Sequence, residues 1–595
     1  MYTSLLISCF AVAAIATTPD STSGEERSPE PPDCSSSCSC FHDEYSSELH
    51  VYCSSRKLSS IPSDLPQATH SLWMDGNNFT SLPASAFHSL SALDFLNLQS
   101  GQLSSLDPQS LRGLGSLSHL HLERNRLRSV PANIFYHTPN LASLGLHSNQ
   151  ITRIEEGLFS GLSSLWLLNL AWNSLAVLPE TSFQDLQSLR ELNLAENRLA
   201  YLHPHLFQGL VELQELDLTG NFLKVIKANV FHKLQKLQKL YLSQNLIHMV
   251  APRAFVGMKS LRWLDLSSNR LVGLYEETFS GLPSLHVLRL SNNSIAGLRL
   301  RIFRDLPYLE ELRLSHNRIK VLVERTFDGL GHLEVLALDH NHIQEARLGS
   351  FLGLPHLAVM SLTGSCFRSL PEQVFKGLAN LHSLHLDGSC LTRIRPQTFS
   401  GLTGLRRLFL QHNSISLLDD QSFAELPGLQ ELDLRFNKLV STSSQTFAGL
   451  KSLEYLLLSS NQLQHLPEEA FAPLQRLSWL DLSSNKLESI QNSTLLPLSR
   501  LRYLNVKRNS LRSFPDGFPG NMEQLWLDGN PWHCNCSALP LRDYSLSKPQ
   551  TVPRLVETLE DGDDKIVYNN ITCASPPSTA GIDLRDIGNE HFQDC

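Results

Sequence analysis

An asparagine returns along this chain every 24 residues, or at a multiple of 24, and no other feature constrains the fold as strongly. The asparagines in this register are Asn77, Asn125, Asn149, Asn173, Asn197, Asn221, Asn245, Asn269, Asn293, Asn317, Asn341, Asn413, Asn437, Asn461, Asn485 and Asn509. Gly101, Ser365 and Ser389 occupy the same register, and a shortened last unit carries Asn530, which makes twenty units. This period predicts a stack of repeated units, and a chain of 595 residues is too long for one compact core.

Each unit follows the pattern L-x-x-L-x-L-x-x-N-x-L, which is the pattern of leucine-rich repeats. The central L-x-L, such as Leu264 to Leu266, predicts a short strand whose leucines point inward while the x positions face a concave surface. The asparagine is expected to point inward too, and to hydrogen-bond backbone groups that would otherwise lack a partner. We therefore predict an α/β leucine-rich repeat solenoid, a horseshoe with a parallel concave sheet and an irregular convex side.

A phenylalanine stands ten residues after the register position in most units, from Phe87 to Phe471. Leu111 and Leu495 replace it twice. Because these side chains recur in the part of each unit that follows the strand, we expect them to fill the convex half of the core.

The two ends of the chain differ from the repeats. Residues 1–16 are short and apolar and end in A-I-A, which indicates a secretory signal peptide; a membrane anchor is the alternative, but a span needs ~18 apolar residues. Residues 17–33, rich in Ser, Pro and Glu, predict a disordered leader. We assign 34–65 to a cysteine-rich N-terminal cap, 66–530 to the repeats and 531–595 to a cysteine-rich C-terminal cap, because the open ends of a solenoid need covering. No later segment is apolar enough to span a membrane, so we expect a soluble secreted protein.

Cysteine usage fits secretion. Ten cysteines remain after the signal peptide: Cys34, Cys38, Cys40, Cys53, Cys366, Cys390, Cys534, Cys536, Cys573 and Cys595. Their even number indicates disulfides, and a zinc site is the alternative for the C-x-C clusters. N-x-S/T sequons, which suggest a glycoprotein, occur at Asn78, Asn292, Asn492, Asn535 and Asn570.

Two neighbouring units break the pattern in the same way, as S-L-T-G-S-C-F and H-L-D-G-S-C-L (361–367 and 385–391). Cys366 and Cys390 therefore occupy equivalent positions in adjacent turns. Neighbouring strands lie ~4.8 Å apart and a disulfide needs Cα atoms ~4.4–6.8 Å apart, so we predict a Cys366–Cys390 bond that contributes about 3 kcal/mol. Two free buried thiols are the alternative. Each Asn-to-Ser change is expected to weaken the ladder by ~1 kcal/mol.

The predicted concave face carries acidic side chains at the positions six, four, two and one residues before the register position. Glu191, Glu196, Glu215 and Asp217 fall on two neighbouring strands, Glu123 stands three turns earlier, and the next two turns present Lys239, Tyr241, Trp263 and Asp265. We predict that these residues, apart from Lys239, bind a partner. Like charges on adjacent strands repel one another, so a partner is a reason to keep them, and a solvated face is the alternative.

Aromatic residues recur on the same face as Trp73, Phe95, Trp172, Phe409, Phe436, Tyr455, Trp479, Tyr503 and Trp526. Solvent-facing Trp and Tyr are typical interface anchors, although stacking on one another is the alternative. Histidines also occupy this face, as His119, His121, His147, His316, His340, His385 and His412. A metal site at His119 and His121 is one interpretation, ligand-free exposed histidines are a second, and pH-sensitive binding is a third, because His charges below about 6.5.

Catalytic motifs are missing from the sequence. It contains no H-E-x-x-H, G-x-S-x-G, G-x-x-x-x-G-K-S/T or G-x-G-x-x-G, and no cysteine is left over once the disulfides are counted. Carboxylate pairs such as Glu215 and Asp217 are expected on an open, solvated surface, where nothing raises a pKa for general acid catalysis. We predict no enzyme, no cofactor and no metal. The net charge of −9 argues against nucleic acid and allows a basic protein partner.

Several off-consensus stretches carry a more specific resemblance. They are F-L-N-L-Q-S-G-Q-L (95–103), H-L-H-L-E-R-N (119–125), I-K-A-N-V-F (226–231), L-P-E-Q-V-F-K-G-L (370–378), L-H-S-L-H-L-D-G-S-C-L (381–391) and Y-N-N-I-T-C-A-S-P-P (568–577). Across essentially its whole length the chain resembles the acid-labile subunit family of the insulin-like growth factor ternary complex. Both cysteine groups resemble the caps of extracellular leucine-rich repeat proteins, which implies the pairs Cys34–Cys40, Cys38–Cys53, Cys534–Cys573 and Cys536–Cys595.

The resemblance implies a plasma glycoprotein without catalytic activity, monomeric until it binds insulin-like growth factor together with its binding protein of type 3 or 5. Such a complex is too large to leave the vessels, which prolongs the lifetime of the hormone. The binding proteins of this family carry a basic C-terminal segment, which suits an acidic concave face. One departure is E-T-L-E-D-G-D-D-K (557–565), which lacks the additional Cys pair expected there. The alternatives are an adhesion or signalling protein of the matrix or cell surface, and the non-catalytic subunit of a plasma carboxypeptidase.

Overall fold

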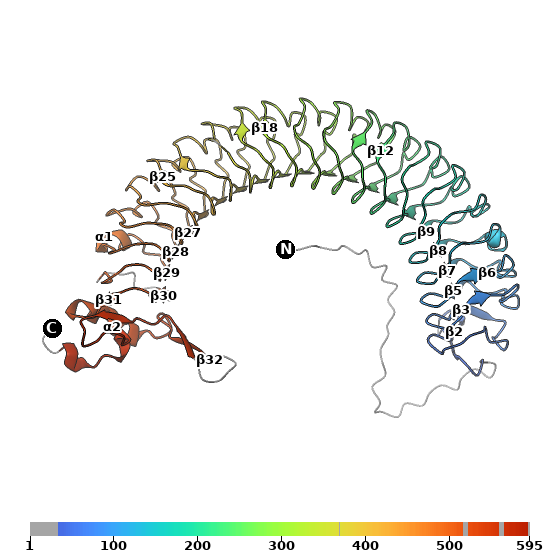
Figure 1. Ribbon diagram of the computed structural model, residues 1–595, viewed down its shortest axis with the longest axis horizontal. Helices are drawn as coiled ribbons and strands as arrows, with labels where there is room; N and C mark the ends of the chain where they lie inside the picture. Colours follow the sequence, from blue (N-terminus) through green and yellow to red (C-terminus); the bar gives the residue numbers. More distant parts are fainter. Residues whose placement is uncertain (1–33, 44, 368, 516–521, 559–564, 593–595) are drawn as a thin grey trace.

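The computed structural model describes residues 34–43, 45–367, 369–515, 522–558 and 565–592. These residues form a horseshoe-shaped arc with the main sheet on its inner side, the N-terminal cap at one end and the C-terminal cap at the other (Figure 1). The predicted signal peptide (1–16) and leader (17–33) lie outside the described residues. Within the described ranges, no helix combines the length and the apolar character that crossing a membrane requires.

Twenty-two of the described strands form one sheet along the concave side (Figure 1). They are β1 (Ser39–His42), β2 (Leu49–Tyr52), β3 (Thr69–Trp73), β5 (Phe95–Asn97), β7 (His119–His121), β8 (Ser143–Gly145), β9 (Leu167–Asn169), β10 (Glu191–Asn193), β11 (Glu215–Asp217), β13 (Lys239–Tyr241), β15 (Trp263–Asp265), β16 (Val287–Arg289), β17 (Glu311–Arg313), β19 (Val335–Ala337), β21 (Val359–Ser361), β22 (Ser383–His385), β24 (Arg407–Phe409), β26 (Glu431–Asp433), β27 (Tyr455–Leu457), β28 (Trp479–Asp481), β29 (Tyr503–Asn505) and β30 (Gln524–Trp526). β1 and β2 pair antiparallel, and the later pairs in this sheet are parallel. From β3 to β29 the register places residues 24 apart in the sequence side by side.

The asparagine ladder forms as predicted. At Asn269, Nδ2 donates to the carbonyl oxygens of Leu242 at 2.9 Å and Leu266 at 3.1 Å, and Oδ1 accepts from the backbone N–H of Ile247 at 3.0 Å. Leu242 and Ile247 belong to the preceding turn, so the side chain joins two turns. Because the coil encloses these backbone groups, the amide supplies hydrogen bonds that water cannot.

The phenylalanines stack behind the sheet and fill the convex half of the core, as predicted. The rings of Phe255 and Phe279, for example, have centroids 6.5 Å apart and lie 4° from parallel, and the replacements Leu111 and Leu495 are buried in the same row.

The convex side consists mostly of turns, so the helical part of the predicted α/β class is small. Its regular elements are the parallel pairs β4 (Ser81–Leu82) with β6 (Ser105–Leu106), β12 (Val225–Ile226) with β14 (Met249–Val250), β18 (Val321–Leu322) with β20 (Glu345–Ala346) and β23 (Arg393–Ile394) with β25 (Leu417–Leu418), and the helices η1 (Ile134–His137) and α1 (Asn492–Leu495).

The two adjacent units that carry Ser365 and Ser389 in place of a ladder asparagine are joined by a disulfide between Cys366 and Cys390, whose Cα atoms are 4.8 Å apart. Both cysteines are exposed, so the bond lies on the surface. The Oγ of Ser389 donates to the carbonyl of Leu362 at 3.1 Å and replaces part of the ladder. The buried Oγ of Ser365 has no hydrogen-bond partner among the described residues. The two substitutions therefore weaken the ladder unequally.

The caps cover the ends of the coil. In the N-terminal cap the β1–β2 hairpin is held by Cys34–Cys40 and Cys38–Cys53, the pairs that the resemblance implied. In the C-terminal cap Cys534 bonds Cys573, and Cys536 is also disulfide-bonded, but its implied partner Cys595 lies outside the described residues. The elements of this cap are β31 (Trp532–His533) paired with β34 (Cys573–Ser575), β32 (Leu555–Thr558) paired with β33 (Lys565–Tyr568), and the helices η2 (Cys536–Ala538), α2 (Leu539–Ser547), η3 (Leu584–Asp586) and η4 (Asn589–Phe592).

Candidate protein-binding surface

One row of the candidate surface crosses the strands β10, β11, β13 and β15. Glu191, Glu215, Lys239 and Trp263 follow one another in this row, each paired with the next. The Nζ of Lys239 lies 3.0 Å from Oε2 of Glu215. Burial, together with the neighbouring charge of Glu215, raises the pKa of Glu191. One lysine therefore faces two glutamates, and Glu191, the glutamate farther from it, is destabilised as an anion.

A second row runs through the ends of the same strands. Asp217, Tyr241 and Asp265 lie side by side, two residues further along their strands than the first row. The Oδ1 of Asp217 accepts a hydrogen bond from the backbone N–H of Thr219 at 2.9 Å, yet burial raises the pKa of Asp217, with a further contribution from the nearby carboxylates. Burial and the same carboxylates raise the pKa of Tyr241 to about 12.

These pKa shifts correct one expectation. Carboxylates on this face were expected to be fully solvated, with nothing to raise a pKa, and this is wrong for Glu191 and Asp217. Partly desolvated anions are costly unless a cation or a hydrogen-bond donor compensates them. The surface is thus better suited to a cationic partner than a solvated acidic face would be.

Glu196 lies at the turn that follows β10 and, together with Glu191, Glu215 and Asp217, forms what we call the acidic surface. It directly precedes the ladder residue Asn197 and has a left-handed backbone, with φ of 53°. Its carboxylate lies over Gly220 in the next turn, where a Cβ would collide with it. The glycine therefore makes room for Glu196 beside the strand that carries Asp217.

Trp263 is held between two neighbours. The ring centroids of Tyr241 and Trp263 are 6.5 Å apart, and the guanidinium of Arg289 lies 4.2 Å from the Trp263 ring centroid. Arg289 is also 3.5 Å from Glu311. Sequence reasoning missed Arg289, although its register position, beside Asp265 in the next turn, is a signal that could have identified it. The cation fixes the ring from one side and marks the end of the acidic surface.

Glu123, which the sequence groups with the partner-binding residues, does not share this environment. Its side chain is 8% exposed, and Oε1 lies 2.8 Å from Nδ1 of His121. Burial alone would raise its pKa, but the hydrogen bond and the charge of His121 hold the pKa of Glu123 below the ordinary value. The carboxylate lies over Gly145, which has no side chain to exclude it.

Many of the other predicted aromatic anchors stack on neighbouring rings. Trp73 stacks on Tyr52 with centroids 4.3 Å apart, and Trp479 on Tyr503 at 3.5 Å. Trp172, by contrast, is 61% exposed. Further ring contacts of this set include Trp73–Phe95, His385–Phe409, His412–Phe436 and Tyr455–Trp479. The alternative of mutual stacking therefore applies to most of this set.

A groove of about 1050 Å³ lies beside the last strands of the sheet. Its aromatic wall is Tyr455, Trp479 and Tyr503, and its charged lining mixes both signs. The charged residues that line it are Glu454, Arg476, Arg500, Arg502 and Glu523. Because the charges do not share one sign, the groove is less selective for a charged partner than the acidic surface.

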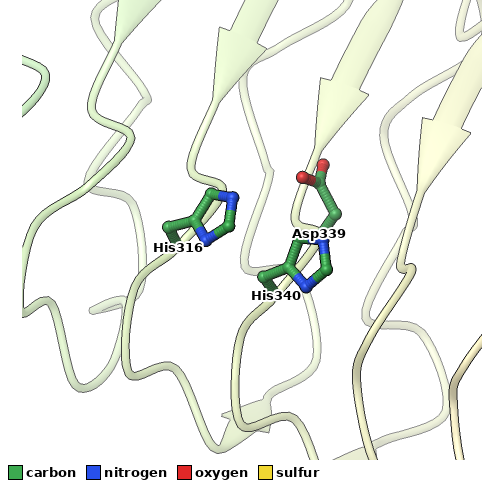
Figure 2. A group of neighbouring side chains, drawn as sticks. All are labelled: His316, Asp339 and His340. Carbon is green, nitrogen blue, oxygen red and sulfur yellow. The ribbon is translucent and has the colours of Figure 1, made fainter. Parts of the chain in front are cut away.

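The histidines of the concave face differ in their burial and in the side chains that they contact. Nδ1 of His119 lies 2.6 Å from Oγ of Ser118, while Nδ1 of His121 lies 2.8 Å from Oε1 of Glu123, so each ring has a partner of its own. Burial lowers the pKa of His119, His147 and His385, so these three become charged at a lower pH than an ordinary histidine. His316 and His340 instead lie together with Asp339 (Figure 2).

The sequons differ in accessibility. Asn78, Asn292, Asn492 and Asn535 are exposed, whereas Asn570 is half-buried and its Nδ2 donates to Oγ1 of Thr572 at 3.0 Å. Four of the five side chains are therefore open to a glycosylating enzyme in the folded protein.

The comparisons with known proteins identify the repeat. A family described as leucine rich repeat matches overlapping segments that run from residue 69 to residue 531. A second family, the leucine rich repeat N-terminal domain, matches residues 33–66.

Curated relatives match a short part of the chain. The insulin-like growth factor-binding protein complex acid labile subunit of Homo sapiens is 57% identical over 81 residues, and that of Papio hamadryas 56% over 81 residues. Each match covers 13% of this chain and 13% of the relative. Leucine-rich repeat-containing protein 3 of Danio rerio is 40% identical over 73 residues, which cover 12% of this chain and 27% of that protein.

Solved structures share the fold over most of the chain. A glycosylated Toll–Spatzle complex from Drosophila aligns with a TM-score of 0.67 at 20% identity, over 93% of this chain and 75% of that one. The plant peptide hormone receptor RGFR1, solved with RGF2, aligns with a TM-score of 0.53 at 24% identity, over 84% and 83% of the two chains. At these identities the likeness concerns the fold alone.

Proposed function

This chain belongs to the leucine-rich repeat family, and from that premise we propose that it is a non-catalytic plasma protein that joins insulin-like growth factor and its binding protein in one complex. The observation that carries the proposal is the 56–57% identity to acid labile subunits over about 80 residues. The matched segment spans 13% of those relatives, so their partners are extended to this chain as a proposal. The partner is insulin-like growth factor bound to its binding protein of type 3 or 5, and the complex extends the lifetime of the hormone.

The acidic surface, defined by Glu191, Glu196, Glu215 and Asp217, is the proposed contact for a basic segment of the binding protein. Two of its carboxylates have raised pKa values because they are partly desolvated. A cationic side chain placed beside them favours their charged forms and compensates the lost hydration. Long-range attraction by the same charges accelerates association and is weakened by salt.

Tyr241 and Trp263 are the proposed anchors beside the acidic surface. Both are partly exposed on adjacent strands, and Trp263 is fixed by Arg289 from its far side. Rigid aromatic rings bury a large area at a small cost in conformational entropy, which is why they dominate protein interfaces. The arrangement supports recognition of a segment that carries both basic and apolar side chains.

A secreted, extracellular location accompanies this function. Disulfides hold both caps and join two repeats, and such bonds persist in oxidising compartments. The rival proposals are a matrix or cell-surface adhesion or signalling protein and the non-catalytic subunit of a plasma carboxypeptidase. They share the fold, so a binding measurement has to separate them from the first proposal.

The test is a titration of the full chain with three ligands at neutral pH: the hormone, the binding protein, and their preformed binary complex. Sedimentation velocity reports the mass of each species. The proposal expects one copy of the chain per binary complex, with much weaker binding to the hormone alone. A chain that stays monomeric with every ligand contradicts the proposal and favours the rivals.

A further inference from the structure

Two histidines and one aspartate meet at the edge of the concave sheet, in the turns that follow β17 and β19. One potential ligand atom from each of His316, Asp339 and His340 lies within 4.8 Å of the other two (Figure 2). Both histidines are exposed and Asp339 is half-buried. Among the described residues, no other group of three or more His, Cys, Asp or Glu side chains has its ligand atoms all within 4.8 Å of one another.

The repeat itself creates this cluster. His316 and His340 each directly precede a ladder asparagine, and both have left-handed backbones with φ of 54° and 53°. Equal backbone conformations in adjacent turns aim both rings in the same direction, and their centroids are 4.5 Å apart. The backbone N–H of His316 donates to the carbonyl of Asp339 at 2.9 Å, which ties the two turns together.

Asp339 is oriented by its own neighbour. Its Oδ1 accepts a hydrogen bond from Oγ of Ser315 at 2.8 Å, from the turn that carries His316. No hydrogen bond within the described residues uses Oδ2. A carboxylate fixed through one oxygen in this way presents the other oxygen as a ligand, which is a common supporting arrangement at metal sites.

We propose that His316, Asp339 and His340 bind one Zn²⁺ ion, a site distinct from the acidic surface. Two imidazole nitrogens and one carboxylate oxygen are a donor set that suits Zn²⁺, and three protein ligands leave a fourth position for water or for a donor from a partner. Ligand atoms around tetrahedral Zn²⁺ lie roughly 3.4 Å apart, so the rings turn out of their stacked arrangement to close on the ion. Their exposure leaves room for this rotation, and His340 lies over Gly364, which has no side chain to obstruct it.

A third histidine in the same register, His412, provides the internal control. His412 also precedes a ladder asparagine with a left-handed backbone, and it stacks on Phe436 at 4.5 Å. The residue before His412 is Gln411, so neither a second imidazole nor a carboxylate completes a donor set there. His412 therefore shares the stacking and the exposed position of the cluster but not its ligands.

The experiment uses the full chain without a polyhistidine tag, stripped of metal and then titrated with Zn²⁺ in competition with a chromogenic chelator. His316→Ala, His340→Ala and Asp339→Asn are each expected to weaken the tightest Zn²⁺ site by about tenfold or more. His412→Ala is expected to leave that site unchanged. Co²⁺ provides a second readout, because a tetrahedral site gives visible absorption bands that the three variants should lose.

Asp339→Asn keeps the shape of the side chain and an oxygen that can accept from Ser315, so it separates loss of a ligand from loss of fold. Thermal melts of all four variants check that the repeats remain intact. Zn²⁺ affinity that is unchanged in both His316→Ala and His340→Ala, or that falls equally in His412→Ala, overturns the proposal. Loss confined to the three cluster variants supports it.

Discussion

The side-chain amine of Lys239 lies 3.0 Å from the carboxylate of Glu215, across the paired strands β13 and β11. This pair stands inside the acidic surface, so the molecule neutralises one of the charges that we assign to partner binding. Both side chains are substantially exposed, and ion pairs of this kind contribute little to stability. Lys239 therefore mainly makes the electrostatic potential of the acidic surface less negative and contributes little to the stability of the fold.

Replacing Lys239 is expected to strengthen binding of a basic partner. Lys239→Gln frees Glu215 and removes a repulsive cation, so the affinity for the binary complex should rise several-fold, with a steeper dependence on salt. Surface plasmon resonance over a salt series measures both quantities. The matched control is Lys236→Gln, which breaks a Lys236–Glu212 pair between the same two turns but outside the sheet strands. Equal effects of the two substitutions would contradict the assignment of the surface.

Glu191 and Asp217 give a pH dependence whose sign is set by their raised pKa values. Between the unfolded and the folded pKa values, the folded protein binds more protons than the unfolded chain, so these groups make stability rise as pH falls through that window. Glu191→Gln/Asp217→Asn should therefore increase the free energy of unfolding at neutral pH. The double substitution should also weaken the dependence of the free energy of unfolding on pH within this window.

Urea denaturation between about pH 4 and pH 7 measures this change. Groups such as Glu123 and Asp583, whose pKa values are lowered, act in the opposite direction but equally in both proteins, so the difference isolates Glu191 and Asp217. A variant that is less stable than the parent at neutral pH is the result that this account does not allow.

Gly145→Ala tests why Glu123 is buried. An added Cβ would collide with the Glu123 carboxylate and displace it from His121, at a cost of about 1–2 kcal/mol. In a Glu123→Ala background the same substitution should cost little, because nothing remains to be displaced. A double-mutant cycle by chemical denaturation reports this coupling, and additive effects would contradict the described contact.

The Cys366–Cys390 bond is expected to contribute about 3 kcal/mol, because it closes a segment of 24 residues. Cys366→Ala/Cys390→Ala should lower the free energy of unfolding by about that amount, measured without reductant. Because both cysteines are exposed, a mild reductant should also lower the free energy of unfolding of the parent. The same reductant should lower that of the double variant, which keeps its other disulfides, by a smaller amount. An unchanged free energy of unfolding in the double variant would contradict this, because it would show that the two turns are stable without the disulfide.

The fold could be predicted because one contact geometry recurs. Asn269 and Phe255 each repeat the role of residues 24 positions away, so a period in the sequence becomes a ladder and a stack in space. The same register predicts that Glu191 and Glu215 lie on neighbouring strands, and the structure confirms it. The disulfide between equivalent positions of adjacent turns followed from the same geometry.

The side chains on that frame were harder to predict, because their environment depends on the neighbouring turn. Glu123 is buried since residue 145 is a glycine, and Trp263 is fixed since residue 289 is an arginine. The pattern predicts His316 and His340 as histidines of the concave face, and it does not associate Asp339 with them. Each of these contacts requires comparing residues 22 to 26 positions apart, together with side-chain rotamers that a pattern of residue types does not contain.

Partner binding by the acidic surface is tested most directly by the affinity of the binary complex for a variant in which all four residues of that surface are replaced by lysine. The matched control reverses four exposed acids outside the sheet strands, namely Glu156, Glu180, Glu276 and Glu277, so that the net charge changes equally. We expect reversal of Glu191, Glu196, Glu215 and Asp217 to weaken binding about a hundredfold or more and to remove most of its salt dependence, while the control retains the parent affinity within about threefold. Equal affinities of the two variants, with the same response to salt, would contradict the claim that this surface binds the partner.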